Sequence, residues 1–310
     1  MSKRCLICRK PADSGYEFHI KCSKKFFGVF PPPELDLTLS EIQEYAARLV
    51  LERVSVTGVQ KKLSLGFDGS RRDSRLTIVG LWGQFILKPP SEEYQSLPEN
   101  EDTIMHLTAV LNISRVPHAM VRLASGELAY ITRRIDRNDD NKKIAMEDFC
   151  QISGRLTEDK YKGSVERIGK LLHQYSVYPG LDTVDLFERV IFSYLFANSD
   201  MHLKNYSLIE TPHGMRLSPA YDLLSTVLAI PEDIEESALT INGKKSKLKK
   251  IDFDGLAESM KIAPAVYLKT YKKFANSVRS IHRIINQGFL PDSMKNTLIN
   301  VFHKRLELFL

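Results

Sequence analysis

Residues 184–205 read VDLFERVIFSYLFANSDMHLKN, so a strongly apolar segment leads directly into a loop that contains Asp, His, Lys and Asn. The apolar side chains fall on nearly every side of a helix over 183–197, which predicts a helix buried in the core of a helical lobe. The end of such a helix is a rigid support for a functional site. A polar loop after a helix is also common in proteins without a site there, so the loop alone leaves both interpretations open.

The spacing of Asp200 and Asn205 resembles that of loops that catalyse phosphoryl transfer. In those loops the Asp accepts the proton of the attacking hydroxyl, and the Asn oxygen binds Mg²⁺, a hard cation that prefers oxygen ligands. Lys204 is suited to neutralising the transferred phosphate, and His202 to orienting the loop through hydrogen bonds. These residue types therefore predict catalytic roles for Asp200, Lys204 and His202.

A further acid, Asp222, follows in SPAYDLLST, residues 218–226. The intervening segment reads as a short hairpin around His213 and Gly214, and a hairpin returns the chain to its starting point. We therefore expect Asp222 close to Asn205, where the two would hold one Mg²⁺ ion. The alternative is that Asp222 caps the turn that follows it.

Lys88 ends an apolar strand in FILKPP, residues 85–90. A lysine that leaves a buried strand must find an anion or reach solvent, so Lys88 is a candidate for binding phosphate groups. Neither of the usual glycine-rich phosphate loops, GxGxxG and GxxxxGK[ST], occurs in the sequence. The segment SVTGVQKK, residues 55–62, lies between two strand-like runs and is the candidate for a loop over the nucleotide.

The order of the predicted elements indicates an α+β protein with two lobes. Short segments rich in β-branched residues extend from Val54 to about Ile135, interrupted by one helix over 99–113, and helical patterns dominate beyond residue 150. The expected domains are a cysteine-rich module at residues 1–30, a sheet-rich lobe at residues 31–148 and a helical lobe at residues 149–310.

Three of the four cysteines lie near the N-terminus, in the order Cys5, Cys8, His19 and Cys22. Two thiolates in a Cys-x2-Cys loop can bind one ion, and tetrahedral Zn²⁺ accepts three cysteines and one histidine. The segment is too short to be stable alone, so such an ion would be structural. Reduced thiols without a metal are the alternative. Cys150 lies in an apolar context and is expected in the core.

Composition restricts the classes of function. Hydrophobic residues make up 43% and charged residues 26% of the 310 residues, which is typical of a globular protein. The net charge of +6 is a small excess for this length and does not indicate direct nucleic-acid binding. No apolar run is long enough to cross a bilayer, and no signal peptide is recognisable at the start. We expect a cytoplasmic protein without membrane contact.

Seven motifs occur in the order found in HipA-like serine/threonine kinases, the toxins of bacterial toxin–antitoxin pairs: SVTGVQKKLSL, FILKPP, LPENE, RRIDR, MEDFCQ, NSDMHLKN and SPAYDLLST. The chain resembles a short, HipT-type member of this family over roughly residues 40–260, and its cysteine-rich start is also similar to that of short members. The resemblance implies a bilobed kinase fold related to phosphoinositide 3-kinase-like enzymes, with ATP and Mg²⁺ as cofactors.

The resemblance also implies roles for individual residues. Asp200 matches the catalytic Asp of the family, and Asn205 and Asp222 match its magnesium ligands. Lys88 matches the phosphate-binding lysine, with Glu101 as its candidate partner. Nucleotide contacts are implied for Glu147 and Phe149 in the segment that holds adenine, and for the loop residues Ser55, Val56, Thr57 and Gly58.

By the same resemblance, Ser55 or Thr57 is the autophosphorylation site, where a phosphate would repel the nucleotide phosphates and open the loop. The implied function is a toxin that phosphorylates an essential translation protein, an aminoacyl-tRNA synthetase. The implied partners are a HipB-like DNA-binding antitoxin and a separate small HipS-like protein. Two alternatives stay open: a catalytically inactive pseudokinase that binds an antitoxin, and a small-molecule kinase.

Overall fold

The computed structural model describes residues 4–12, 15–51, 62–68, 74–80, 82–138 and 140–310. The chain divides into two compact units. The first consists of residues 1–102, 116–143 and 287–289, and the second of residues 103–115, 144–286 and 290–310. The cysteine-rich start is thus part of the first unit. The domain limits expected from the sequence stay a prediction.

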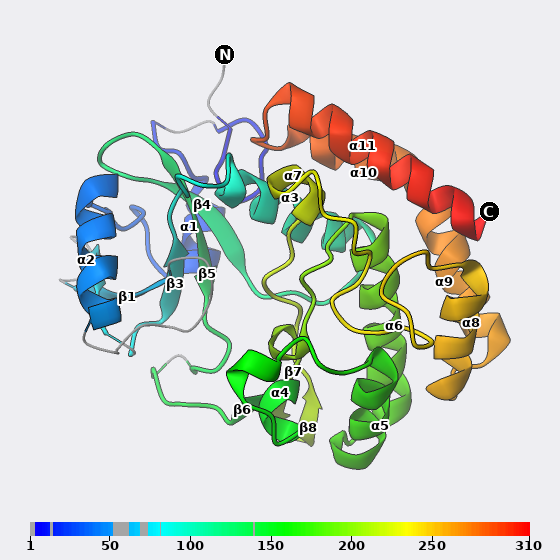
Figure 1. Ribbon diagram of the computed structural model, residues 1–310. Coiled ribbons are helices and arrows are strands. Elements are labelled where there is room, and N and C mark those ends of the chain that lie inside the picture. Colours follow the sequence, from blue (N-terminus) through cyan, green and yellow to red (C-terminus); the bar gives the residue numbers. More distant parts are fainter. Residues whose placement is uncertain (1–3, 13–14, 52–61, 69–73, 81, 139) are drawn as a thin grey trace. The chain divides into compact units, whose positions relative to one another are not determined.

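The first unit is built on a five-stranded antiparallel sheet with the strand order β2-β1-β3-β5-β4 (Figure 1). The strands are β1 (Leu63–Asp68), β2 (Arg75–Ile78), β3 (Phe85–Lys88), β4 (His118–Arg122) and β5 (Leu128–Arg133). Lys88 lies directly opposite Tyr130 in the register of β3 and β5. The antiparallel sheet predicted from the β-branched segments is confirmed.

Two helices of the first unit precede the sheet in the chain. These are α1 (Ile20–Phe27) and α2 (Leu39–Leu51). Phe26 and Phe27 pack against Phe85 of β3, with ring centroids 5.7 and 5.9 Å apart. Because His19 is the residue that precedes α1, this packing also fixes one end of the cysteine-rich segment on the sheet.

Helix α3 (Leu97–Val110) carries the LPENE motif in its first two turns. The sequence predicts this helix over 99–113, so the structure begins it two residues earlier and ends it three residues earlier. Residues up to Asp102 belong to the first unit, and the remainder of the helix belongs to the second. Glu101 and Asp102 are both buried, with 1% and 0% of their surface exposed.

The second unit is mainly helical, as the sequence predicts. Its helices are α4 (Phe149–Ile152), α5 (Val165–Tyr175), α6 (Pro179–Leu195), α7 (Thr226–Ala229), α8 (Lys250–Ser259), α9 (Pro264–Asn276), α10 (Val278–Gln287) and α11 (Asp292–Leu306). Single turns of 3₁₀-helix lie at η1 (Thr157–Asp159), η2 (Leu203–Asn205) and η3 (Glu307–Phe309). Among the described residues, none of the helices combines the length and the apolar character needed to span a membrane.

Helix α6 is the central helix of this unit. Eleven of its 17 residues are buried, which agrees with the all-round apolar pattern of the sequence. Even Arg189 is only 2% exposed, and it donates to the Asp185 carboxylate from Nε at 3.1 Å and from Nη2 at 2.6 Å. Pro179 begins the helix, a position where its missing N–H costs nothing.

A small antiparallel sheet with the order β6-β7-β8 completes the second unit. Its strands are β6 (Met146–Asp148), β7 (Ser207–Thr211) and β8 (Gly214–Leu217). β7 and β8 form the hairpin predicted around His213 and Gly214, with Thr211 opposite Gly214. The sequence did not indicate β6, because three residues are too few to establish an alternating pattern.

Candidate active site

The polar loop, residues 198–205, begins just after α6, where backbone hydrogen bonds end the helix. Ala197 adopts a left-handed conformation with φ of 52°, and the amide of Asn198 donates to the carbonyl of Ser193 at 2.8 Å. A left-handed residue with such a bond is a common helix C-terminus. Residues 198–205 therefore leave a well-defined helix end, as the sequence predicts.

Asp200 and Asn205 are brought together within this loop. The carbonyl of Asp200 accepts hydrogen bonds from the amide of His202 at 2.8 Å and from the side-chain Nδ2 of Asn205 at 2.9 Å. Asn205 is 7% exposed and stands at the end of η2. An amide side chain has donors on its nitrogen and acceptors on its oxygen, so this bond uses the donor side and leaves the oxygen as the candidate metal ligand.

The Asp200 carboxylate accepts a hydrogen bond from Tyr161, a residue that the sequence did not indicate. The hydroxyl of Tyr161 lies 2.6 Å from Oδ1 of Asp200. Partial burial raises the pKa of Tyr161 well above its ordinary value, and the bond to Asp200 raises it further. The phenol therefore stays protonated and acts as a donor to one carboxylate oxygen.

His202 is buried behind the same loop, with 6% of its surface exposed. Its ring packs edge-on against that of Tyr161, with centroids 5.1 Å apart. Burial lowers the pKa of His202 below its ordinary value, although the negative charges of Asp200 and Asp222 oppose this shift. Nδ1 of His202 is buried without a hydrogen-bond partner among the described residues, so the predicted role of orienting the loop through hydrogen bonds stays a prediction.

The hairpin β7–β8 returns the chain to the polar loop, as the sequence predicts. The hydroxyl of Tyr221 donates to the carbonyl of Lys204 at 3.0 Å and lies 2.5 Å from Oγ of Ser207. Asp222 follows directly, with φ of 55°, a left-handed conformation that non-glycine residues adopt at a cost. The residue before Asp222 is thus attached to the polar loop, and the charge of Asp222 acts on His202 of that loop, while the predicted approach of Asp222 to Asn205 stays a prediction.

A second attachment joins the loop to the start of α7. Oγ1 of Thr226 accepts from the amide of Ser199 at 3.2 Å, lies 2.7 Å from the Ser199 hydroxyl and donates to the carbonyl of Ala197 at 2.8 Å. The amide of Thr226 donates to the same carbonyl at 2.7 Å. The chain on both sides of Asp222 is thus tied to the loop that carries Asp200.

Lys204 has a carboxylate partner, Asp148, at 3.3 Å. Asp148 also begins α4 through a capping box with Gln151. Glu147, the preceding residue of β6, is exposed, whereas Phe149 is fully buried and its amide donates to the carbonyl of Tyr206 at 3.0 Å. The side chain of Phe149 therefore contributes to the core, and the predicted adenine contacts of Glu147 and Phe149 stay predictions.

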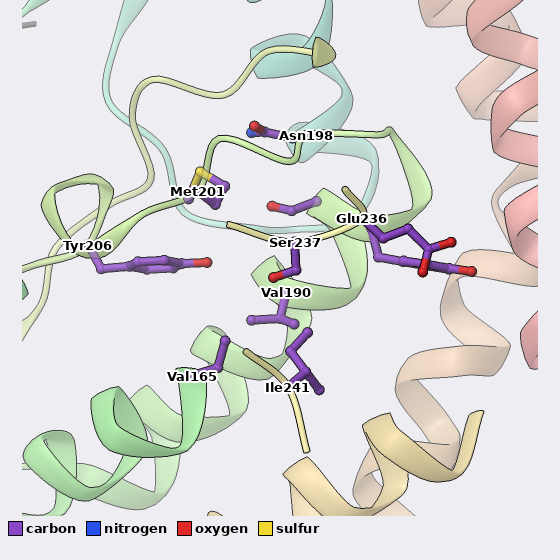
Figure 2. Close-up of a pocket in the computed structure, with 10 residues that line it drawn as sticks. Val165, Val190, Asn198, Met201, Tyr206, Glu236, Ser237 and Ile241 are labelled. Atoms are coloured by element: carbon purple, nitrogen blue, oxygen red, sulfur yellow. The ribbon is translucent and has the colours of Figure 1, made fainter. Parts of the chain in front are cut away.

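A small cavity of about 10 Å³ lies on the core side of the polar loop (Figure 2). Asn198 and Met201 of the loop line it, together with Ser193 of α6. In the described part of the chain, Oγ of Ser193 and Nδ2 of Asn198 have no hydrogen-bond partner. The cavity has room for about one water molecule, which two such polar atoms can hold. The cavity is therefore too small to hold a nucleotide or a substrate.

In the first unit, Lys88 and Glu101 form a buried ion pair. Nζ of Lys88 lies 2.5 Å from Oε1 of Glu101, and both side chains are at most 3% exposed. Nζ also lies 5.4 Å from the centre of the Tyr130 ring. The predicted pairing of Lys88 with Glu101 is confirmed as a contact. The predicted loop residues Ser55, Val56, Thr57 and Gly58 lie outside the described residues.

The N-terminal cysteines come together as their spacing predicts. One ligand atom from each of Cys5, Cys8, His19 and Cys22 lies within 4.8 Å of the others. Sγ of Cys8 is 3.3 Å and Sγ of Cys22 is 3.7 Å from Nδ1 of His19. Cys150 lies apart in the core, 2% exposed.

Comparison with known proteins gives the family. Residues 54–286, about three quarters of the chain, match the family described as HipA-like C-terminal domain. The chain belongs to this family. The family resemblance expected from the seven motifs is thereby confirmed.

Several curated relatives carry kinase names. The "Putative kinase Y4dM" of Sinorhizobium fredii is 32% identical over 81% of this chain and 63% of its own length. A "Putative kinase" of Haemophilus influenzae is 27% identical over 98% of this chain and 96% of its own. The "Serine/threonine-protein kinase toxin HipA" of Shewanella oneidensis is 28% identical over 59% of this chain and 45% of its own length. The chain thus spans about half to two thirds of the length of the Sinorhizobium and Shewanella relatives, and nearly all of the length of the Haemophilus relative.

Solved structures show the fold. HipA of Shewanella oneidensis MR-1, determined with HipB and operator DNA, matches 90% of this chain and 72% of its own with a TM-score of 0.69 and 21% identity. The Helicobacter pylori proinflammatory kinase CtkA matches 80% of this chain and 93% of its own with a TM-score of 0.53 and 14% identity. The α+β fold of these kinases is therefore the fold of this chain.

Proposed function

We propose that this chain is an ATP-dependent serine/threonine protein kinase that acts as the toxin of a toxin–antitoxin system. The observation that carries the proposal is the bond between Asn205 and the Asp200 carbonyl, together with the bond from Tyr221, the residue before Asp222, to the Lys204 carbonyl of the same loop. These contacts support a site in which Asp200 accepts a proton and the oxygen atoms of Asn205 and Asp222 bind the metal. Membership of a family with kinase-named relatives supports the same reaction.

The side chains at the loop fit a magnesium–nucleotide complex. The candidate ligands, the Asn205 amide oxygen and the Asp222 carboxylate, offer oxygen atoms, which Mg²⁺ prefers over nitrogen and sulfur. When bound, Mg²⁺ would neutralise charge on the phosphates of ATP and help to align them. Lys88 would bind phosphate oxygens from the first unit, with Glu101 holding its ammonium group. Glu147 and Phe149 would border the adenine.

Within this proposal, Asp200 accepts the proton of the substrate hydroxyl as that oxygen attacks the γ-phosphorus, while the bond from this phosphorus to the β–γ bridging oxygen breaks and ADP leaves. Tyr161 donates to Oδ1 of Asp200, so the second carboxylate oxygen is the one that takes the proton. His202, neutral and buried, orients the loop. Lys204 exchanges its contact with Asp148 for the transferred phosphate.

The finer features of the function follow from the family resemblance. They are autophosphorylation at Ser55 or Thr57, an aminoacyl-tRNA synthetase as substrate, a HipB-like antitoxin and a small HipS-like partner. The Shewanella complex of HipA with HipB and operator DNA supports an antitoxin partner. We place the protein in the cytoplasm, where ATP and these partners are found. Zn²⁺ is proposed for the cysteine cluster as a structural ion.

The test is phosphorylation of the purified full chain with radiolabelled ATP and Mg²⁺. Wild type is expected to label itself and one protein of a lysate, and Asp200→Asn is expected to lose both signals. Asp292→Asn is the matched control, because it makes the same change at a side chain that is 92% exposed. Full labelling by the Asp200 variant would overturn the assignment, whereas ATP binding without any transfer by wild type would favour a pseudokinase.

Identification of the substrate needs a second experiment. Phosphopeptides are compared by mass spectrometry after brief expression of wild type or the Asp200→Asn variant. One translation protein modified only by wild type is expected. Labelling of sugars or amino alcohols, with no labelled protein, would instead indicate a small-molecule kinase.

A further inference from the structure

The cysteine cluster has the dimensions of a tetrahedral zinc site. Zinc binds thiolate sulfur at about 2.3 Å and imidazole nitrogen at about 2.0–2.1 Å, so neighbouring sulfur and nitrogen ligands lie roughly 3.5 Å apart. The two sulfur–nitrogen distances in the cluster, 3.3 Å from Cys8 and 3.7 Å from Cys22, lie on either side of this value. The His19, Cys8 and Cys22 atoms are therefore spaced for tetrahedral zinc, and the Cys5 atom lies within 4.8 Å of all three.

The orientation of His19 is a second, independent feature of a metal site. Its Nε2 lies 2.7 Å from the carbonyl oxygen of Pro11. A carbonyl can only accept, so the proton resides on Nε2, and the lone pair of Nδ1 faces the sulfur atoms. Zinc-binding histidines are typically held in this way, by a carbonyl on the nitrogen that does not bind the metal.

The backbone holds the ligands in place from both sides. The Cys5 carbonyl accepts from the amide of Arg9 at 2.8 Å, which closes the turn that contains Cys8. Arg9 itself has φ of 62°, a left-handed conformation. His19 precedes α1, and Cys22 is in the first turn of that helix, an arrangement that brings the two side chains together.

Arg9, directly after Cys8, connects the cluster to α3. It is 3% exposed, and its Nε donates to Oδ2 of Asp102 at 3.1 Å, while Nη2 binds the same oxygen. Asp102 is fully buried. A buried ion pair has strict geometry, because either charge alone in the core is costly. The conformation of the cysteine turn therefore affects the position of Asp102.

Asp102 is adjacent to Glu101, which holds Lys88. A second connection runs through His118, whose Nε2 is 3.8 Å from Oδ1 of Asp102 and whose ring stacks on Tyr130 at a centroid distance of 5.7 Å. The same Tyr130 ring lies beneath Nζ of Lys88. All these residues belong to the first unit.

We propose that Cys5, Cys8, His19 and Cys22 bind one Zn²⁺ ion, and that this ion, by fixing Arg9 against Asp102, positions the turn of α3 that carries Glu101. Arg9 and Asp102 are thus positioning residues for Lys88. This link rests on the proposed function only in that it gives Lys88 its task of binding ATP phosphates. The metal site and its effect on α3 stand independently of phosphoryl transfer.

The metal is tested first, by measuring the zinc content of the purified full chain. Wild type is expected to hold one zinc ion per chain, and the Cys8→Ser and Cys22→Ser variants are expected to hold much less. The control Cys150→Ser, which changes a cysteine outside the cluster, should hold one zinc ion per chain, as wild type does. Wild type stripped by a chelator and supplied with Co²⁺ should show the visible absorption of a tetrahedral thiolate site. Absence of zinc and of this cobalt spectrum in wild type would overturn the proposal without reference to any variant.

The link is tested by hydrogen exchange of the backbone amides in residues 97–102. Removal of zinc from wild type is expected to speed this exchange about tenfold and to weaken ATP binding about tenfold, an ordinary size for coupling between two sites. Arg9→Met and the milder Asp102→Asn should do the same with zinc retained. Arg122→Met is the matched control, because Arg122 pairs with Glu17 of the N-terminal segment at 2.7 Å on the surface.

The outcomes separate the two proposals. Unchanged exchange in residues 97–102 after zinc removal and in the Arg9 variant would overturn the link to α3. If zinc is bound and exchange responds as expected but wild type binds no ATP, the proposed kinase function fails while the metal site and its link remain.

Discussion

Asn205 donates its side-chain amide to the carbonyl oxygen of Asp200 at 2.9 Å, so the residue proposed to bind the metal also shapes the turn that carries the proposed base. The two roles use different atoms of one side chain. Substitutions that remove one atom or both can therefore separate them.

Asn205→Asp retains an oxygen ligand but loses the amide donor and places a carboxylate against the Asp200 carbonyl. We expect its rate of autophosphorylation to fall about tenfold to a hundredfold, because a lost hydrogen bond that leaves a group unsatisfied costs about 1–3 kcal/mol. Asn205→Ala, which also removes the ligand, should be inactive. Initial rates over a range of Mg²⁺ concentrations measure both effects. An Asp variant as fast as wild type would contradict the role of the bond in shaping the loop.

Lys88→Met removes the cation that lies 2.5 Å from the buried Glu101 carboxylate. We expect the free energy of unfolding in urea to fall by about 3–5 kcal/mol, the usual cost of removing one partner of a buried ion pair. The double variant Lys88→Met with Glu101→Gln should recover most of this loss, yet neither should bind ATP in a titration. Lys295→Met, at a surface ion pair, is expected to change stability by less than about 1 kcal/mol. Recovery of ATP binding in the double variant would refute a phosphate-binding role for Lys88.

Tyr161→Phe removes the donor to Oδ1 of Asp200 and retains the ring that packs on His202. A hydrogen bond to a charged group contributes about 1.5–3 kcal/mol, so we expect the maximal rate to fall by roughly tenfold or more with little change in the KM for ATP. Steady-state kinetics of protein phosphorylation distinguish this supporting role from one in which Tyr161 competes with the substrate hydroxyl for Asp200. If Tyr161 merely occupied the place of the substrate hydroxyl, the variant would be as fast as wild type or faster.

His202 gives the fold a pH dependence whose sign follows from its burial. Its pKa in the folded protein lies below the ordinary value of 6.5, so the unfolded chain takes up the proton first as the pH falls. The free energy of unfolding should therefore decrease as the pH falls below 6.5. Above pH 6.5, His202 should contribute no pH dependence to it. Urea unfolding of wild type and His202→Gln at about pH 7.5 and about pH 5.5 measures the difference. His213→Gln, at an exposed hairpin position, is the control, and equal pH dependence of wild type and the His202 variant would contradict the prediction.

The sequence predicted those parts of the site that lie close together along the chain. Asp200 and Asn205 are five residues apart after a helix with an unmistakable apolar pattern, and Asp222 is returned by a hairpin whose turn residues are evident. The Lys88–Glu101 contact was expected only from the family resemblance, because neither the strand pattern around Lys88 nor the helical pattern around Glu101 indicates which partner each side chain meets.

Residues contributed by remote segments were not predicted. Tyr161 reaches Asp200 from 39 positions away, and Thr226 holds Ser199 across 27 positions. Nothing in the local pattern around a tyrosine or threonine indicates which loop it will contact. The partner of Lys204, Asp148, was similarly hidden, because it lies in the short strand β6 and serves as a helix cap at the same time.

Glu101 and Asp102 are consecutive, yet one carboxylate binds Lys88 and the other Arg9. Successive side chains of a helix point about 100° apart, which is how two neighbours serve two different partners. An insertion of a single residue between Glu101 and Asp102 would change the angle between the two carboxylates from about 100° to about 200°, so that they could no longer meet Lys88 and Arg9 together. Among homologues that share this pair of contacts, the two acidic residues should therefore remain consecutive.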